Sequence, residues 1–294
     1  GRDHPLRLVL CGVALQSLPA GSHVLLCDDS YFSIRVIARD WLPRWGMSAT
    51  VVDFTDLDAV RAALRPDTRL LWAATPSNPL LKVNDIAALA AIAHGAGARL
   101  LVDSTFAPPT LQRPLALGAD VVMQSATKYL GGHGDVMGGV LSFADDGEHA
   151  AACHGQRLLG GATASPFAAW MILRGLRSLP ARMDWHCRNA MAVARWLAAH
   201  RRVDAVHYPG LDSHAGHAVA ARQMHGGFGG MLSFEVAGGR EAADNLLVAG
   251  LDLGLRQPLA QIVDADHQHD GASTAPDDLV EPGQQCHALA AQLL

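Results

Sequence analysis

Short continuous runs of apolar residues recur between residues 22 and 143, and segments with helical spacing separate them. The runs predict buried strands at residues 23–27, 49–53, 69–73, 99–103, 121–124 and 140–143. One helix is predicted to start at Thr55, where Asp58 follows a hydroxyl cap by three residues, and another runs from about Asn84 to Gly95 and Gly97. Continuous apolar strands that alternate with helices are typical of a mostly parallel sheet covered on both faces.

The pattern changes after residue 143, where a long helix is predicted over about residues 166–200. Pro180 is expected to kink or divide this helix. Its predicted apolar face consists of Trp170, Leu173, Leu176 and Leu179. Two further strands, at residues 203–208 and 231–236, are joined through a glycine-rich link. These elements predict a large domain over residues 1–181 and a smaller C-terminal α+β domain over residues 182–294, without clear periodicity after about residue 250.

Composition narrows the classes of function. The 294 residues are 50% hydrophobic and 17% charged, with a formal net charge of -5, which is typical of a soluble globular chain. This balance leaves no basic stripe, so no nucleic-acid partner is expected, whereas a small acidic or zwitterionic substrate is compatible with it. No apolar run reaches the roughly 18 residues that span a bilayer, so no membrane partner is expected.

The five cysteines are scattered along the chain, without the close pairs of a zinc site or a disulfide framework. Reduced thiols in a cytoplasm are therefore expected. His267 and His269, beside three aspartates, could share one face of a strand and bind a metal. Because their segment is polar and aperiodic, a solvated loop is favoured and no metal site is predicted.

Candidate chemistry centres on Lys128, one of only two lysines in the chain. It follows the apolar run at residues 121–124 and precedes a glycine-rich segment. A lysine near apolar walls and cationic neighbours has a depressed pKa, so its free amine can attack a carbonyl, and pyridoxal phosphate is the carbonyl most often used. The alternative explanation is compositional: in a chain whose basic residues are mostly arginine, any lysine is rare, and its rarity then says nothing about function.

Other groups that this cofactor needs occur at predicted strand ends. Asp103 ends a buried strand, where a carboxylate could keep a pyridine nitrogen protonated, although a helix N-cap is the alternative. Ser125 and Thr127 flank Lys128 closely enough to offer hydroxyls to a phosphate. Tyr31 follows another strand and could stack on a pyridine ring, although taken alone it is better explained as a loop or core aromatic residue.

Five short motifs follow one another along the chain. They read TPSNPL at 75–80, DSTF at 103–106, SATKYLGGH at 125–133 with Asp135, RGLRSL at 174–179 and YPGL at 208–211. Together they resemble the Cys/Met-metabolism family of pyridoxal-phosphate enzymes, over about residues 18–244. That family contains cystathionine gamma-synthase, the cystathionine lyases, methionine gamma-lyase and the homoserine sulfhydrylases.

The resemblance implies a fold-type I, aminotransferase-like α/β large domain. It also implies bound pyridoxal 5'-phosphate near a subunit interface and a homo-oligomer, either a dimer or a tetramer. By position, it implies that Lys128 forms the Schiff base and moves protons between substrate carbons, while Asp103 pairs with the pyridine nitrogen.

The same resemblance assigns four further residues. Ser125 and Thr127 would hold the phosphate, and Tyr31 would stack on the ring and assist proton transfer. Asn78 would lie near the cofactor's phenolic oxygen or the substrate carboxylate.

Both ends of the sequence depart from the family's pattern. The N-terminal arm and the Gly-Met pair expected near residues 7–8 are missing. After about residue 250, the serine-bearing loop and the arginine that binds the substrate carboxylate are not matched, and Arg256 is a poor substitute by context. After Tyr31, the usual Gly-Gly-Thr is replaced by FSI, as in a synthase or lyase subgroup.

The expected activity is trans-sulfuration, by gamma-elimination or gamma-replacement on a homoserine-ester or cystathionine-type amino acid. Cystathionine beta-lyase or methionine gamma-lyase activity is the alternative within the family. A catalytically impaired or inactive fold-type I scaffold is the alternative outside it, because the departures lie where phosphate and substrate carboxylate should be held.

Overall fold

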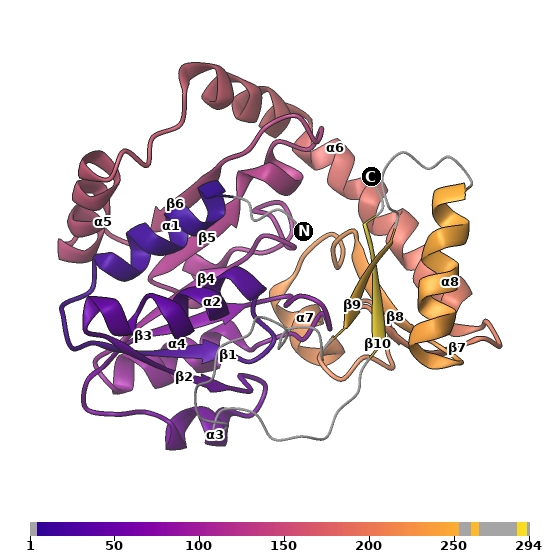
Figure 1. Ribbon diagram of the computed structural model, residues 1–294, viewed down its shortest axis with the longest axis horizontal. Coiled ribbons are helices and arrows are strands. Elements are labelled where there is room, and N and C mark those ends of the chain that lie inside the picture. Colours follow the sequence, from indigo (N-terminus) through magenta and orange to yellow (C-terminus); the bar gives the residue numbers. More distant parts are fainter. Residues whose placement is uncertain (1–4, 253–259, 265–286, 293–294) are drawn as a thin grey trace.

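The computed structural model describes residues 5–252, 260–264 and 287–292, whose strands form two sheets (Figure 1). The first sheet has six strands in the order β2-β1-β3-β4-β5-β6. Their bounds are β1 His23–Cys27, β2 Ser48–Val52, β3 Thr68–Ala74, β4 Arg99–Asp103, β5 Val121–Ser125 and β6 Gly139–Phe143. All neighbouring pairs are parallel except β5 with β6. The predicted mostly parallel α/β sheet is confirmed.

Helices cover both faces of this sheet. Successive side chains of a strand point to opposite faces, so neighbouring residues of one strand pack against different helices. Leu71 of β3 belongs to a buried cluster with α4 (Ile86–Gly95). The next residue, Trp72, belongs to a second cluster with α1 (Pro5–Gln16) and α2 (Phe32–Asp40). Two apolar layers therefore hold the strands between them, so that the carboxyl ends of the strands are rigidly placed.

The start of α3 (Leu57–Ala62) differs from the prediction. Asp56 caps this helix, because its carboxylate accepts hydrogen bonds from the backbone amides of Asp58 and Ala59. The hydroxyl of Thr55 donates to Asp53 at 2.7 Å instead, so the predicted Thr55 cap is wrong. A carboxylate directly before the helix competes better for its free amides than a hydroxyl one residue earlier.

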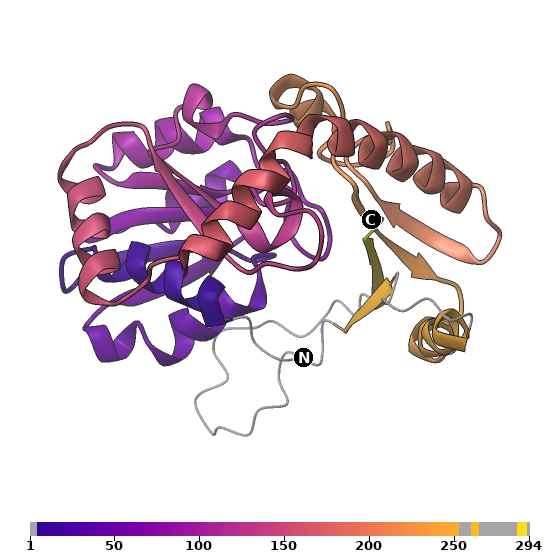
Figure 2. The ribbon, with the colours of Figure 1, turned by 90° about the horizontal axis from the view of Figure 1, so that it is seen from above.

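The second half of the described chain forms an antiparallel sheet in the order β7-β8-β10-β9. Helix α6 runs from the first sheet to the second (Figure 2), and the predicted boundary between residues 181 and 182 falls inside it. The remaining bounds are α5 Glu148–Leu159, α6 Pro166–Ala198, β7 Val203–His207, α7 His217–Gln223, β8 Met231–Val236, α8 Gly239–Asp252, β9 Ala260–Asp264 and β10 His287–Gln292, with 3-10 turns η1 Pro43–Trp45 and η2 Pro114–Leu117.

The apolar face predicted for α6 is only partly buried. Leu179 is buried, whereas Trp170 is 58% exposed and Leu173 is 52% exposed. The N-terminal half of the helix therefore turns its apolar stripe outward. Pro180 lies inside a helix that continues to Ala198, so it does not divide the helix.

Buried amides join α7 to the loops of the first sheet. The Gln223 side chain donates to the carbonyl of Asn84 at 3.1 Å and to Oε1 of Gln112 at 3.0 Å. Its Oε1 accepts from the backbone amide of Ile86 at 3.3 Å. Three polar groups that burial would otherwise leave unpaired are thus satisfied from the second half of the chain.

Among residues 5–252, 260–264 and 287–292, no helix is long and apolar enough to cross a membrane. The same residues contain no group of three or more His, Cys, Asp or Glu side chains that could hold a metal ion. The alternative metal site at His267 and His269 lies outside the described residues.

Candidate functional site

The predicted site residues gather at the carboxyl edge of the first sheet. Asp103 is the last residue of β4 and Ser125 the last of β5, while Tyr31 follows β1 and Asn78 follows β3. These four strands are neighbours and run parallel, so their ends share one edge. The strand order reverses between β1 and β3, and ligands of open α/β sheets bind in the crevice at such a switch point.

Asp103 is 5% exposed, and its carboxylate is oriented by Thr105. Its Oδ1 accepts from the backbone amide of Thr105 at 3.1 Å and from the Thr105 hydroxyl at 2.5 Å. The same hydroxyl accepts from the backbone amide of Ser125 at 3.0 Å. Thr105, to which sequence reasoning gave no role, therefore links the ends of β4 and β5. The N-cap alternative for Asp103 is wrong, since the next helical element, η2, begins at Pro114.

Lys128 lies in a tight π-helical turn, η3 (Ala126–Leu130), between β5 and β6. Its own backbone is not helical, with φ -94° and ψ -125°. The amide of Gly131 donates to the carbonyl of Ala126, and that of Gly132 to the carbonyl of Lys128, each at 2.8 Å. These bonds fix the backbone on the C-terminal side of the half-buried lysine.

Helix α6 approaches the Lys128 turn at Gly175. A Cβ at this position would lie 2.2 Å from the carbonyl oxygen of Gly131 and 2.5 Å from that of Leu130. Only glycine allows two backbones to come this close. The turn is therefore supported from behind by a long helix.

The two hydroxyls that flank Lys128 have different surroundings. Ser125 is buried at the end of β5. The hydroxyl of Thr127 accepts from the backbone amide of Gly138 at 3.2 Å and donates to the Gly138 carbonyl at 3.4 Å. Thr127 thus ties the Lys128 turn to the start of β6, and its role toward a phosphate stays a prediction.

Tyr31 directly precedes α2, and its ring centroid lies 5.0 Å from that of Phe32. The backbone amide of Asn78 donates to the carbonyl of Asp29 at 3.3 Å, so the loops after β1 and β3 touch. Ser30, between Asp29 and Tyr31, is fully buried, and its hydroxyl has no hydrogen-bond partner among the described residues. An unsatisfied polar atom of this kind is typical of a site that a ligand completes.

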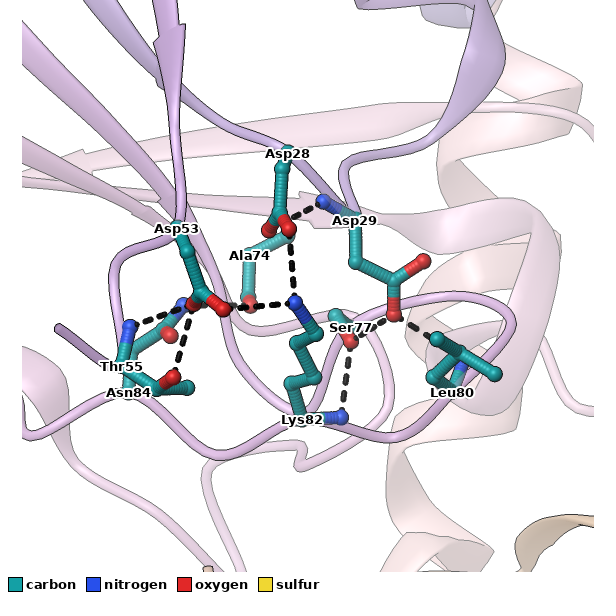
Figure 3. A network of polar contacts seen from close by, with 9 residues as sticks. All are labelled: Asp28, Asp29, Asp53, Thr55, Ala74, Ser77, Leu80, Lys82 and Asn84. Carbon is teal, nitrogen blue, oxygen red and sulfur yellow. Dashed lines mark hydrogen bonds and ion pairs between the residues drawn. The ribbon is translucent and has the colours of Figure 1, made fainter. Parts of the chain in front are cut away.

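The other lysine, Lys82, stands in a polar network beyond β1, β2 and β3 (Figure 3). Its Nζ donates to Oδ2 of Asp28 at 2.6 Å and to Oδ2 of Asp53 at 2.9 Å. Asp53 also accepts from the backbone amide and the hydroxyl of Thr55. Sequence reasoning missed this network, although two aspartates at predicted strand ends and a rare lysine were the available signal.

A second set of contacts in Figure 3 involves Asp29 and Ser77. The Ser77 hydroxyl and the backbone amide of Leu80, at 3.0 Å, both donate to Oδ2 of Asp29. The backbone amide of Lys82 donates in turn to the Ser77 hydroxyl at 2.8 Å. The side chain of Asp29 is thus connected to the backbone of Lys82 through the Ser77 hydroxyl.

The pKa shifts of Lys82, Asp53 and Asp29 show how each of these groups is charged. Burial alone would lower the pKa of Lys82, but its hydrogen bonds to Asp28 and Asp53 outweigh burial and raise the pKa. Burial would raise the pKa of Asp53, yet the bonds from Lys82 and Thr55 lower it. Burial raises the pKa of Asp29 despite the bonds from Ser77 and Leu80. Lys82 is therefore held as a cation, a form that cannot attack a carbonyl.

A cavity of about 940 Å³ lies between the loops of the first sheet and the second sheet, and its lining includes Lys82, His207 and His214. Burial, followed by the nearby His207 and His217, lowers the pKa of His214 to about 4, so this imidazole is neutral at pH 7. None of the six predicted site residues lines this cavity. We therefore place the candidate chemistry at the carboxyl edge of the sheet, where the reactive groups are, and not in this cavity.

The residues at the carboxyl edge fit pyridoxal phosphate. Lys128 offers an amine, Asp103 a fixed carboxylate, Ser125 a hydroxyl and Tyr31 an aromatic ring, which are the groups that a pyridine carbonyl compound with a phosphate requires. The described contacts link Asp103 with Ser125 through Thr105, and the loops of Tyr31 and Asn78 through Asp29.

Comparison with known proteins gives a family match over most of the chain. Residues 10–253 match the family described as Cys/Met metabolism PLP-dependent enzyme. Cystathionine gamma-synthase of Mycobacterium tuberculosis is 46% identical over 275 residues, which cover 90% of this chain and 70% of the relative. Cystathionine beta-lyase of Coxiella burnetii is 45% identical over 223 residues, covering 76% of this chain and 57% of the relative.

A solved structure supports the same fold. The metB protein of Corynebacterium glutamicum superposes with a TM-score of 0.86 at 35% sequence identity. The superposition covers 97% of this chain and 74% of the other. The predicted fold-type I architecture is thereby confirmed.

Proposed function

Because this chain belongs to the Cys/Met metabolism family of PLP-dependent enzymes, we propose that it catalyses gamma-replacement or gamma-elimination in trans-sulfuration. The proposed substrate is an amino acid of the homoserine-ester or cystathionine type. The likeness to a cystathionine gamma-synthase over 90% of the chain supports the choice of the gamma carbon. The observation that carries the proposal is the Thr105 bridge, which joins Asp103 to the strand end that leads into the Lys128 turn.

Lys128 is the proposed attachment point and proton carrier. Its Nζ is the group that would bind the cofactor's carbonyl carbon. Once the substrate's amino group has displaced it, the same amine would take the proton from the alpha carbon and carry protons between the substrate carbons. The backbone bonds of Gly131 and Gly132 hold the Lys128 turn in place during these transfers.

Asp103 is the proposed partner of the ring nitrogen. Pyridoxal phosphate, when bound, supplies a protonated pyridine ring that withdraws negative charge from the alpha carbon of the substrate. Asp103 holds the proton on the ring nitrogen, and its two bonds from Thr105 keep the carboxylate in one orientation. Burial strengthens this ion pair, because little water screens it.

The remaining predicted residues bind and orient. Ser125 and Thr127 are the proposed phosphate contacts on this chain. Tyr31 would cover one face of the ring and exchange a proton with the substrate. Asn78 orients either the phenolic oxygen or the substrate carboxylate through its side-chain amide.

Beta-elimination from cystathionine is the second candidate, favoured by the 45% identity to the Coxiella beta-lyase over 223 residues. The two candidates differ in their products. Gamma-replacement joins the cysteine sulfur to the gamma carbon of the homoserine chain and releases the acid of the ester, whereas beta-elimination from cystathionine consumes water and releases homocysteine, ammonia and pyruvate. An assay that separates these products by mass distinguishes the two reactions.

The test of the proposal combines labelling with turnover. Purified protein is incubated with pyridoxal phosphate, reduced with borohydride and digested, and the modified lysine is identified by mass spectrometry. We expect the modification on Lys128 and not on Lys82, whose ammonium is held by two carboxylates. We then expect cystathionine to form from cysteine and an O-acyl homoserine.

Two outcomes would contradict the proposal. Modification of Lys82, or of no lysine, would remove the cofactor assignment. Modification of Lys128 without turnover of any of these amino acids would support the inactive scaffold instead.

We also propose that the active form is a homo-oligomer, in which a second copy covers the apolar stripe of α6. Phe167, which is 68% exposed, lies one turn before this stripe, and Trp170 and Leu173 within it are also exposed. The variant Trp170→Glu should lower the molar mass found by light scattering. An unchanged mass would place the subunit contact elsewhere.

A reducing compartment such as the cytoplasm is part of the proposal. The four cysteines within the described residues are free thiols, all of them buried. Burial raises the pKa of Cys27 to about 12, so this thiol stays protonated. Thiols of this kind persist where disulfides do not form.

A further inference from the structure

Two loops meet at the switch point of the first sheet, and each carries a predicted site residue. The loop after β1 carries Tyr31, and the loop after β3 carries Asn78. Neither residue lies in a regular element, although Tyr31 directly precedes α2. Their separation therefore depends on how one loop is attached to the other.

Asp29 makes this attachment. Asp29 is 8% exposed, and its carboxylate accepts hydrogen bonds from the Ser77 hydroxyl and the backbone amide of Leu80, which lie on either side of Asn78 in the sequence. Its own carbonyl accepts the backbone amide of Asn78. One residue of the first loop thus makes hydrogen bonds to three residues of the second loop, Ser77, Asn78 and Leu80.

The attachment is supported on both sides. Ser77 is buried and is fixed by the backbone of Lys82, which both donates to its hydroxyl and accepts from its amide. The backbone amide of Asp29 donates to Oδ1 of Asp28, whose Oδ2 binds the Lys82 ammonium. A shift of Asp29 would therefore have to move several bonds at once, which makes the contact stiff.

We propose that Asp29 is a positioning residue, which fixes Asn78 relative to Tyr31 and so sets how the substrate is oriented over the bound cofactor. This inference rests on the proposed function of the site. Asp29 itself need not touch the substrate, because it acts through the backbone of Asn78 and through the short segment that leads to Tyr31. A misplacement of about 1 Å at such a site can reduce the rate by roughly 10²-fold.

The test compares Asp29→Asn with Asp53→Asn. Both changes remove one carboxylate charge from the network in Figure 3, but the Asp53 carboxylate bonds Thr55 and the Lys82 ammonium, and not Ser77, Asn78 or Leu80. We expect Asp29→Asn to lower kcat/KM by about 10²-fold, while Asp53→Asn keeps kcat/KM within about threefold of the wild type. Borohydride labelling of Lys128 should be unchanged in both.

Two further measurements separate positioning from loss of stability. The visible circular dichroism of bound pyridoxal phosphate should change in Asp29→Asn and stay unchanged in Asp53→Asn, because only the first moves groups around the ring. Ser77→Ala should reproduce the kinetic loss of Asp29→Asn, whereas Ser77→Thr, which keeps the hydroxyl, should restore most of it.

Several results would overturn the inference. It fails if Asp29→Asn retains the kinetics and the dichroism of the wild type, or if Asp53→Asn loses as much activity as Asp29→Asn. A wild-type protein without turnover would contradict the proposed function alone, since the dichroism of the two variants would still decide whether Asp29 positions the site. A protein that binds no pyridoxal phosphate would overturn both.

Discussion

Two lysines stand beyond the carboxyl ends of strands in one sheet, and their surroundings differ. The ammonium of Lys82 lies 2.6 Å from Asp28 and 2.9 Å from Asp53, and its pKa is raised by them. Lys128 stands in a tight turn supported by glycines, where backbone and helix α6 approach closely. Two neighbouring carboxylates thus keep Lys82 charged, which stabilises the fold but prevents attack on a carbonyl. Close backbone packing instead fixes the position of Lys128, where we propose that a ligand binds.

The largest effect on turnover is expected at Lys128. Replacing Lys128 by Ala should reduce turnover by about 10⁴-fold or more, because the variant loses both the attachment point and the proton carrier. The matched variant Lys82→Ala should reduce turnover by less than about tenfold, since its ammonium makes no proposed contact with substrate. The measurement is kcat for both variants. Similar losses of kcat would contradict the assignment of the reaction to Lys128 alone.

The next effect concerns the support of the Lys128 turn. Gly175→Ala should destabilise the protein by about 1–3 kcal/mol, because the new Cβ would overlap the carbonyl oxygens of Leu130 and Gly131. Gly155→Ala in α5 is the control, since a Cβ there meets nothing within 4 Å, and it should stabilise by about 0.5–1 kcal/mol. Urea unfolding gives both free energies. A neutral Gly175→Ala would mean that α6 does not support the turn.

A smaller effect is expected at Lys82. Lys82→Met removes the cation between Asp28 and Asp53 and should cost about 1–2 kcal/mol of unfolding free energy. The control is Arg65→Met, which removes an exposed pair with Asp67 and should cost less unfolding free energy than Lys82→Met. Equal costs in the two variants would show that Lys82 makes only an ordinary surface pair.

The smallest effect is the pH dependence of the Lys82 pair. The pKa of Asp53 in the folded protein lies below its ordinary value of 3.8, so the pair stabilises the fold above that pH. This stabilisation is lost as the pH falls through the lower, folded value. The difference in unfolding free energy between wild type and Lys82→Met should therefore be constant from about pH 5 to 8 and shrink below about pH 4. A difference that grows in acid would reverse the assigned sign.

The sequence predicted the sheet well because each buried strand carries its own local pattern. The predicted limits of β1, β4 and β8 agree with the structure. The outward turn of Trp170 was not predictable, since an apolar stripe on a helix looks the same whether it faces the core or the surface.

The site was predictable only in part. Lys128 and Asp103 are recognisable from strand ends and motifs, whereas the Thr105 bridge joins residues 20 positions apart and depends on the pairing of β4 with β5. The bonds from Lys82 to Asp28 and Asp53 span 54 and 29 residues. Hydrogen bonds over such separations leave no periodicity in the sequence, so they emerge only once the strands are ordered in space.

The buried side-chain amide of Gln223 couples the local unfolding of α7 to that of the first sheet. Because it pairs with Gln112 and with the backbone on either side of the α4 N-cap, α7 cannot separate from the first sheet without exposing or orphaning these groups. The two halves of the chain therefore share one cooperative unit across this contact. Hydrogen exchange at the Ile86 amide should then require the departure of a helix more than a hundred residues away in the sequence.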